Sequence, residues 1–423
     1  MTADDLRDLR RDLHKHPEPA WREFYTTARI VDELETRDLD ALYVGPEVLA
    51  EGDRVGVPDD AELDEWMERA EAAGARTDVL DRLSGGYTGA VAIVERGEGP
   101  TVALRVDIDA LPIEESTAED HYPASEGFRS GNEGYMHACG HDAHTTIGIG
   151  VLDAILDSDF AGTLKVCFQP GEERIVGGEP MAKSGHLDDV DYLLAVHVGL
   201  DHPSGEIVAG IDGFLAVSQF EAAFHGESAH AGARPEAGDN AMQAAATAIG
   251  NLYGISRHGD GATRVNVGVI EGGTASNIVA ERVGIEGEVR GETTELMEYM
   301  YGKARRVLRS AAEMHGCETE IHTAGQAPSA RSDDELRAVV ADVARGTDGV
   351  TSILETDHLG GSEDATYLMR RVQENGGKAA YVGVGTDHPG GHHTGTFDVD
   401  EADIGLGVEV LSGAIVEIGK RRP

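Results

Sequence analysis

Side-chain types that bind metals are concentrated in the segment MHACGHDAHTTIGIG, residues 136–150. Cys139 and His141 are separated by one residue, and His144 follows them. A thiolate with imidazoles suits zinc, and carboxylates added to them would also admit manganese. The Cys139-x-His141 pair alone is a weak motif, because a small buried thiol beside the start of a helix gives the same spacing. The segment therefore predicts a metal site only if other segments supply further ligands.

Further polar side chains follow apolar runs elsewhere in the chain. Three strand-like runs end in RVDID, FQPGEE and AVHVG. A fourth run, KAAYVGVG near the end of the chain, leads into a Gly-rich loop, GVGTDHPGGHHTG. In open parallel sheets the carboxyl ends of the strands meet at one edge, where ligands bind. We therefore expect one edge of one sheet to collect Asp107, Asp109, Glu172, Glu173, His197, His388, His392 and His393.

Most of these residues also have an ordinary structural explanation. Asp107 and Asp109 fit helix caps or turns, and His197 fits a hydrogen-bonded side chain of the core. The paired histidines of the Gly-rich loop fit either a surface tract or a metal clip. Glu172 and Glu173, directly after an apolar strand and a Pro-Gly turn, are oddly placed for a solvated pair. Because adjacent side chains diverge, we expect one to bind metal and the other to move a proton from water to the leaving nitrogen.

The elements that must position these residues predict an α/β fold. Apolar residues have helical spacing over 4–14 and 22–36, and strand-like runs occur in GAVAIVE, TVALRVDIDAL, TLKVCFQP and DYLLAVHVG. Helical stretches such as HTTIGIGVLDAIL separate the runs. This alternation predicts a mostly parallel mixed sheet sandwiched by helices. The acidic, Gly-rich residues 40–86 resemble an insertion on that fold.

The pattern changes at about residue 214. Strand, helix, strand, strand, helix and strand then follow, in the order of a ferredoxin-like α+β module. A helix at 332–345 and the run KAAYVGVG then resume the first pattern. The sequence therefore predicts a discontinuous catalytic domain of residues 1–213 and 327–423, with an inserted domain of residues 214–326.

The composition is strongly acidic, with 78 Asp and Glu against 35 Lys and Arg, and a formal net charge of −43. This charge repels nucleic acid and anionic membranes, so neither is an expected partner. Because the acidic residues are spread along the whole chain, the composition predicts a halophilic protein suited to a salt-rich cytoplasm. We expect no signal peptide, because the N-terminal stretch MTADDLRDLRRDLHKHPE is charged throughout, and no membrane-spanning segment, because no run of about 18 apolar residues occurs. Three distant cysteines, Cys139, Cys167 and Cys317, argue against a disulfide framework.

Eight motifs occur in order along almost the whole chain: RRDLHKHPE, RVDIDALP, ACGHDAH, FQPGEE, AVHVG, SAHAGARPEAGDNA, ASNIVAERVGIEGEVR and HHTGTFDVDEA. In these motifs and their order the chain resembles a family of two-metal metallopeptidases and amidohydrolases. The family includes aminoacylase, carboxypeptidase G, hippurate hydrolase and the plant indoleacetyl-amino-acid hydrolases. Other segments, among them GGYTGAVA and EGYMHACGHDAHT, are most similar to the branch that hydrolyses aminobenzoyl-glutamate.

The resemblance implies two divalent metal ions per subunit, either Mn or Zn. Residues that match the ligands of the amidohydrolase branch are Cys139, His141, Glu173, His197 and His393, and Glu172 matches its general base. His393 is preferred to His392 because it stands four residues before Phe397. His144 is expected beside the ligands or in the core.

One ligand of the peptidase branch is missing. That branch has His-x-Asp where this chain has Arg105-Val106-Asp107, so Cys139 and His141 must compensate for the absent histidine.

In the inserted domain, the resemblance implies a lid that also forms a dimer. His230 matches a histidine that reaches across the dimer to stabilise the tetrahedral oxyanion. Asn277 and Arg290 match residues that hold the carboxylate of the substrate, a task suited to a bidentate guanidinium.

We therefore expect a metal-dependent amidohydrolase that acts on a small-molecule N-acyl or N-aroyl amino acid, with aminobenzoyl-glutamate as the leading substrate. An indoleacyl- or benzoyl-amino-acid hydrolase, or an aminoacylase, is the alternative among enzymes. A non-catalytic, metal-stabilised scaffold subunit is an alternative of another class, against which the retention of Glu172 argues. The expected assembly is a homodimer or a heteromer with a related subunit.

Overall fold

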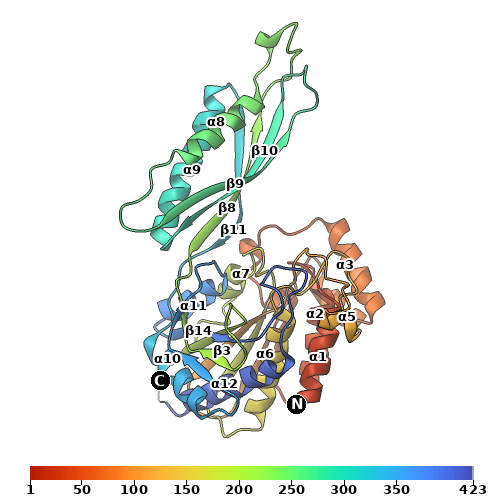
Figure 1. Ribbon diagram of the computed structural model, residues 1–423, viewed down its shortest axis with the longest axis vertical. Helices are drawn as coiled ribbons and strands as arrows, with labels where there is room; N and C mark the ends of the chain where they lie inside the picture. The colour runs from red at the N-terminus through yellow and green to blue at the C-terminus, as the bar shows by residue number, and fades with distance from the viewer. Residues whose placement is uncertain (422–423) are drawn as a thin grey trace. The chain divides into compact units, whose positions relative to one another are not determined.

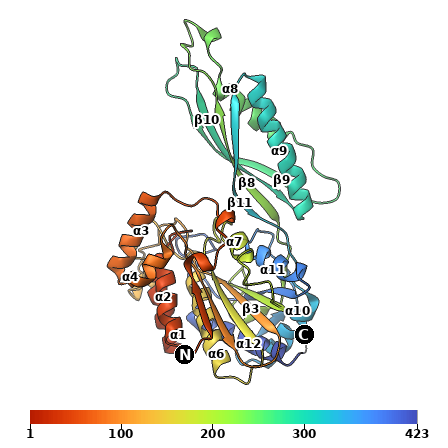
Figure 2. The same ribbon diagram turned by 180° about the vertical axis from the view of Figure 1, so that it is seen from behind.

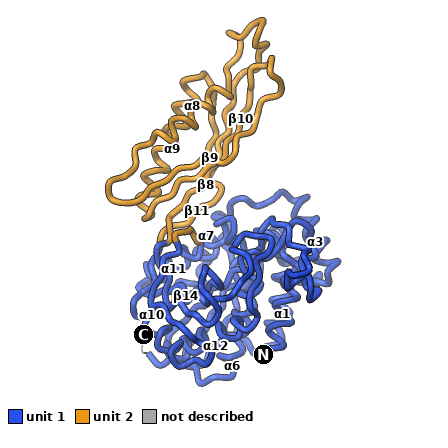
Figure 3. Tube along the Cα trace, in the orientation of Figure 1, with its two compact units in different colours: residues 1–213, 330–359, 364–423 blue, residues 214–329, 360–363 orange. Residues whose placement is uncertain are grey.

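The computed structural model describes residues 1–421, which form two compact units (Figure 3). Unit 1 comprises residues 1–213, residues 330–359 and the chain from residue 364 onward, and unit 2 comprises residues 214–329 and 360–363. The limit expected after residue 326 falls inside a strand, β11 (Glu318–Ala327). The short segment 360–363, expected in the catalytic domain, clusters with unit 2.

Unit 1 is built on an eight-stranded mixed sheet in the order β1-β2-β4-β3-β5-β14-β6-β12 (Figures 1 and 2). The neighbouring strands β4, β3, β5 and β14 run parallel, whereas β2 runs antiparallel to both its neighbours and β6 antiparallel to β14. The predicted mostly parallel sheet is therefore confirmed. The strands are β1 (Ala41–Val44), β2 (Ala90–Glu95), β3 (Thr101–Asp107), β4 (Thr163–Gln169), β5 (Tyr192–Val198), β6 (Glu206–Val208), β12 (Ser352–Leu354) and β14 (Lys378–Val384).

Helices cover both faces of this sheet (Figures 1 and 2). The central strands are continuous apolar runs because both their faces are buried. Val102, Leu104 and Val106 of β3 share one hydrophobic cluster with Ile147 of α6. The helices α1, α6 and α12 pack together, and α11 packs against α7, β5 and β14. The helices are α1 (Ala3–Lys15), α2 (Phe24–Glu35), α3 (Asp60–Ala73), α4 (Thr77–Leu80), α5 (Tyr122–Ser125), α6 (His141–Leu156), α7 (Gly178–Ala182), α10 (Asp334–Gly346), α11 (Ala365–Glu374) and α12 (Glu401–Gly419).

Among residues 1–421, no helix is long and apolar enough to cross a lipid bilayer.

The segment 40–86 belongs to this fold and is not an insertion on it. Its strand β1 pairs antiparallel with β2 and so forms one edge of the sheet. Leu63 and Trp66 of α3 are buried in the main hydrophobic cluster. The strand escaped prediction because it has only four residues, three of them half-buried, and therefore lacks an apolar run.

Unit 2 is a four-stranded antiparallel sheet with two helices. The strand order β11-β8-β10-β9, with α8 and α9 after the first and third strands, is that of a ferredoxin-like module and confirms the predicted element order. Small residues at helical spacing on α8, among them Ala241, Ala244 and Ala248, are buried in the core of this unit. The elements are β8 (Ala216–His225), α8 (Ala241–Tyr253), β9 (Thr263–Gly272), β10 (Arg282–Gly291), α9 (Thr294–Met314) and β11 (Glu318–Ala327).

Candidate metal centre

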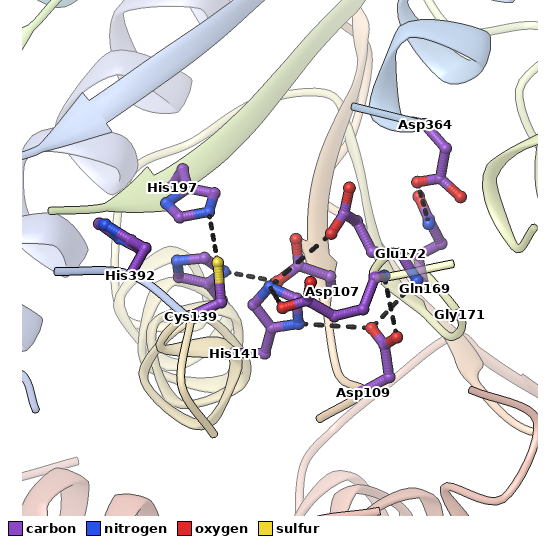
Figure 4. A network of polar contacts seen from close by, with 12 residues as sticks. Asp107, Asp109, Cys139, His141, Gln169, Gly171, Glu172, His197, Asp364 and His392 are labelled. Carbon is purple, nitrogen blue, oxygen red and sulfur yellow. Dashed lines mark hydrogen bonds and ion pairs between the residues drawn. The ribbon is translucent and has the colours of Figure 1, made fainter. Parts of the chain in front are cut away.

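The carboxyl ends of β3, β4 and β5 meet the first turn of α6 in unit 1 (Figure 4). Asp107 is the last residue of β3, and α6 begins at His141. Gly140 precedes the helix with φ 82°, and a Cβ atom there would lie 2.6 Å from Val198 Cγ2. Only glycine fits this left-handed, crowded position, which lets Cys139 and His141 reach the same site.

Cys139, His141 and His197 offer ligand atoms that all lie within 4.8 Å of one another. His197 Nδ1 donates to Val198 O at 2.7 Å, which leaves Nε2 without a proton and facing Cys139 Sγ at 3.4 Å. Burial lowers the pKa of His197 well below its ordinary value. The neutral ring therefore presents a lone pair, as a metal ligand must.

Four carboxylates surround His141 on its other side (Figure 4). Its Nδ1 lies 3.3 Å from Asp109 Oδ1, and its Nε2 lies 3.6 Å from Glu173 Oε1, 3.7 Å from Asp107 Oδ1 and 4.0 Å from Glu172 Oε2. Burial lowers the pKa of His141, but Asp107, Asp109 and Glu173 outweigh it and raise the pKa to about 10. Crowded buried carboxylates need compensating positive charge, so this donor set fits divalent metal ions.

His393 completes a further group with Cys139 and Glu173. Its Nε2 lies 3.4 Å from Glu173 Oε2, and its backbone N–H donates to Ala138 O at 2.9 Å. His392 turns elsewhere, because its Nε2 donates to Val198 O at 3.2 Å. The structure thus brings all five sequence-predicted ligands together with Glu172, and it places His393 rather than His392 beside Glu173.

His144 takes part as a hydrogen-bonding residue. Its Nε2 accepts the N–H of Val198 at 2.8 Å, so the proton is on Nδ1, which donates to Asp107 Oδ1 at 2.5 Å. Burial lowers the pKa of His144, which keeps the ring neutral. Both ring nitrogens are therefore used, and His144 orients the carboxylate of Asp107.

Asp107 itself was expected at this edge but was not among the five predicted ligands. One of its oxygens lies within 4.8 Å of a ligand nitrogen of His141 and of His144. Arg105 Nη1 lies 2.6 Å from the other oxygen, Oδ2. The position at the end of β3 was the sequence signal for this residue.

The loop that carries Glu172 and Glu173 is held by carboxylates from three distant segments. Asp109 accepts the N–H groups of Glu172 and Glu173, each at 3.0 Å. Glu23 Oε1 accepts the N–H of Gly171 at 2.8 Å. Asp364 Oδ2 accepts the N–H groups of Gly177 and Gly178 at 3.1 and 2.7 Å. These contacts fix the backbone on both sides of the two glutamates, and no motif in the sequence pointed to Glu23 or Asp364.

Unit 2 contains the remaining predicted residues, His230, Asn277 and Arg290. The exposed His230 accepts the N–H groups of Gly232 and Ala233 at Nδ1, each at 3.1 Å, so its proton is on Nε2. Asn277 O accepts the N–H of Ala231 at 3.0 Å, which places the two segments side by side. Arg290 lies in β10, where its Nε and Nη2 pair with Glu288 at 2.7 and 3.0 Å.

Comparison with known proteins identifies relatives along almost the whole chain. The family described as Peptidase family M20/M25/M40 matches residues 103–417. The chain is 40% identical over 414 residues to one of the subunits of p-aminobenzoyl-glutamate hydrolase from Escherichia coli (strain K12), covering 97% of this chain and 95% of that protein. It is also 40% identical over 412 residues to the indole-3-acetyl-aspartic acid hydrolase of Enterobacter agglomerans, covering 96% and 94%. A crystal structure of the aminobenzoyl-glutamate utilization protein from Klebsiella pneumoniae superposes with a TM-score of 0.84 at 34% identity, covering 98% and 96%.

Proposed function

The chain belongs to peptidase family M20/M25/M40, a family of metal-dependent hydrolases, and we propose that it cleaves the amide between an aromatic acyl group and an acidic amino acid. The observation that carries this proposal is the adjacent pair Glu172 and Glu173, held by Asp109 beside a cluster of thiol, imidazole and carboxylate donors. Both relatives with 40% identity are named for an aromatic acyl group joined to glutamate or aspartate. Aminobenzoyl-glutamate is accordingly the first substrate to test.

The residues that would hold two divalent ions are Cys139, His141, Glu173, His197 and His393, with Asp107 as a further oxygen donor. The thiolate and imidazoles favour zinc, and the carboxylates also admit manganese. When bound, such ions supply a Lewis acid that polarises the scissile carbonyl and makes water more acidic.

Glu172 is proposed to move the proton. Its backbone is fixed by Asp109, and its carboxylate Oε2 faces His141 Nε2 at 4.0 Å, next to the proposed metal ligands. As a general base it takes a proton from the attacking water while the new C–O bond forms. It then gives that proton to the amide nitrogen as the C–N bond breaks, so the amine leaves neutral.

Three residues of unit 2 are proposed to act on the substrate. His230 has its proton on Nε2, which makes that atom a donor suited to the tetrahedral oxyanion. We propose that it acts in the site of a partner subunit, as the family resemblance implies. Asn277 and Arg290 would hold the α-carboxylate. A heteromer with a related subunit is the second possibility for the assembly, since the Escherichia coli relative is named as one subunit of its enzyme.

A substrate panel tests the proposal. Purified protein supplied with Mn or Zn would be assayed for amine release from aminobenzoyl-glutamate, indole-3-acetyl-aspartate and neutral N-acetyl amino acids. We expect the two aromatic conjugates of acidic amino acids to be hydrolysed most efficiently. Hydrolysis of neutral N-acetyl amino acids alone would assign the chain to the aminoacylases, and no turnover with any metal would favour a scaffold subunit.

A further inference from the structure

Arg54 and Arg174 differ from the other arginines of unit 1 in lacking an acidic partner. Within residues 1–421, every arginine of this unit except Arg54, Arg174 and Arg331 has a carboxylate oxygen within 4.0 Å. Acidic partners are abundant in a chain with 78 acidic and 35 basic residues. Two guanidinium groups without a carboxylate oxygen within 4.0 Å therefore call for an explanation.

Arg54 is held in place by aromatic rings and backbone carbonyls rather than by a close ion pair. Its Cζ lies 3.7 Å from the ring centroid of Tyr87 and 5.0 Å from that of Trp21. Its Nη2 donates to the carbonyl groups of Gly85 and Gly86 at 2.6 and 3.0 Å. Its Nε is buried and has no acceptor in the described part of the chain. The guanidinium is thus fixed in orientation by its neighbours.

Arg174 comes directly after the two glutamates and packs against Gly56, in the segment that carries Arg54. The N–H of Ile175 donates to Glu172 O at 2.7 Å, which closes a tight turn around Arg174. The guanidinium lies against Gly56, with Nη2 3.5 Å and Cζ 3.7 Å from the position that a Cβ atom would take there. Gly56 is two residues from Arg54, so Arg174 packs against the segment that carries Arg54, and Arg174 itself is exposed.

Hydrogen bonds connect the surroundings of Arg54 to the loop of the candidate site. Tyr87, under the guanidinium of Arg54, precedes Thr88, whose hydroxyl donates to Glu23 Oε2 at 2.7 Å. Glu23 Oε1 accepts the N–H of Gly171, the residue before Glu172, at 2.8 Å. The two arginines and the proposed proton carrier are therefore parts of one connected structure within unit 1.

We propose that Arg54 and Arg174 form a subsite for the side-chain carboxylate of an acidic amino acid, distinct from the α-carboxylate. This inference rests on the proposed function and explains a preference for glutamate or aspartate conjugates. Charge-assisted, bidentate hydrogen bonds from guanidinium suit a carboxylate. In a strongly anionic protein, local positive charge is also needed to attract a dianion.

The test measures binding of the free amino acids L-glutamate and L-glutamine. These differ only at the end of the side chain, where glutamate has a charged carboxylate and glutamine a neutral amide. Calorimetric titration of the metal-loaded protein should show glutamate bound roughly 10- to 100-fold more tightly than glutamine, the range for a hydrogen bond to a charged group. Arg174→Met should bring the two affinities within about 3-fold of each other by weakening glutamate alone. Arg331→Met, which removes another exposed and unpaired guanidinium of unit 1, should leave the preference unchanged.

Arg54→Lys provides a second variant that keeps the charge but loses the planar fork, and it should reduce the preference in part. Equal affinities in the wild-type protein, no binding of glutamate, or a preference that survives Arg174→Met would each overturn the subsite. Failure of the proposed function has a different signature. The glutamate preference would be present and sensitive to Arg174→Met, while no aromatic conjugate would be hydrolysed.

Discussion

Arg105 Nη1 lies 2.6 Å from Asp107 Oδ2, with both side chains fully buried in the sheet. The same guanidinium donates from Nε to Gln169 Oε1 at 2.8 Å and lies 3.3 Å, through Nη2, from Asp364 Oδ1. Burial raises the pKa of Asp107, but His141, His144 and Arg105 lower it well below its ordinary value. Arg105 thus helps to keep Asp107 ionised.

Arg105→Met is expected to destabilise the protein, because it removes a buried cation that contacts both Asp107 and Asp364. Breaking a buried ion pair typically costs about 3–5 kcal/mol of unfolding free energy. Urea unfolding measures the loss, with Arg331→Met as an exposed control expected to change stability by less than about 0.5 kcal/mol. Equal stability of the Arg105→Met and wild-type proteins would refute the assigned role.

Cys139→Ser is expected to weaken metal binding, because a serine hydroxyl is a far poorer ligand than a thiolate. The affinity for zinc should fall by more than the roughly 10- to 100-fold that is lost when only an orienting residue is removed. Metal content after dialysis, measured by atomic emission, checks this. Cys317→Ser makes the same substitution in unit 2 and should retain the wild-type content. Equal metal content of the two variants would remove Cys139 from the ligand set.

His14 is expected to make stability fall as the pH rises. Burial and Arg10 lower the pKa of His14, but Asp142 and Glu115, at 2.7 and 3.0 Å, outweigh them and raise it from 6.5 to about 9. The stabilisation is therefore complete below pH 6.5 and is lost as the pH passes 9. It amounts to about 3 kcal/mol, and His14→Gln should remove this part of the pH dependence. If the free energy of unfolding changed with pH in the same way for both proteins between pH 6 and 10, the assignment would be contradicted.

Molar salt is expected to stabilise the folded chain. At 1 M the Debye length is about 3 Å, which screens the mutual repulsion of a chain with formal net charge −43. Thermal unfolding followed from low to molar KCl should show a rising midpoint. A midpoint that stays constant or falls would show that the acidic composition is no adaptation to salt.

The parts of the fold that repeat a simple pattern were predictable from the sequence. The apolar runs at β3 and β5 are long because the strands are buried on both faces, and the six elements of unit 2 alternate clearly. The strand β1 was missed because its four residues are mostly half-buried and carry no such run. Its pairing with β2 is a tertiary contact that local pattern does not encode.

The candidate site shows the same division. Polar residues at strand ends identified Glu172, Glu173 and His197, since the ends of parallel strands converge. The roles of Glu23 and Arg105 depend on contacts between distant segments. One example is the hydrogen bond between Glu23 and Gly171, which are 148 positions apart in the sequence. In the sequence, Arg105 is only a charged residue inside an apolar run. Its contacts with Gln169 and Asp364 can be identified only from the structure.

The central claim is a division of labour between two adjacent glutamates, and paired substitutions test it most directly. Glu172→Gln and Glu173→Gln would be compared for metal content and for kcat on aminobenzoyl-glutamate. We predict that Glu172→Gln keeps its metal and loses roughly 2 to 4 orders of magnitude in kcat, the usual contribution of general acid-base catalysis. Glu173→Gln should instead lose metal. Equal metal content and equal kcat in the two variants would contradict the account.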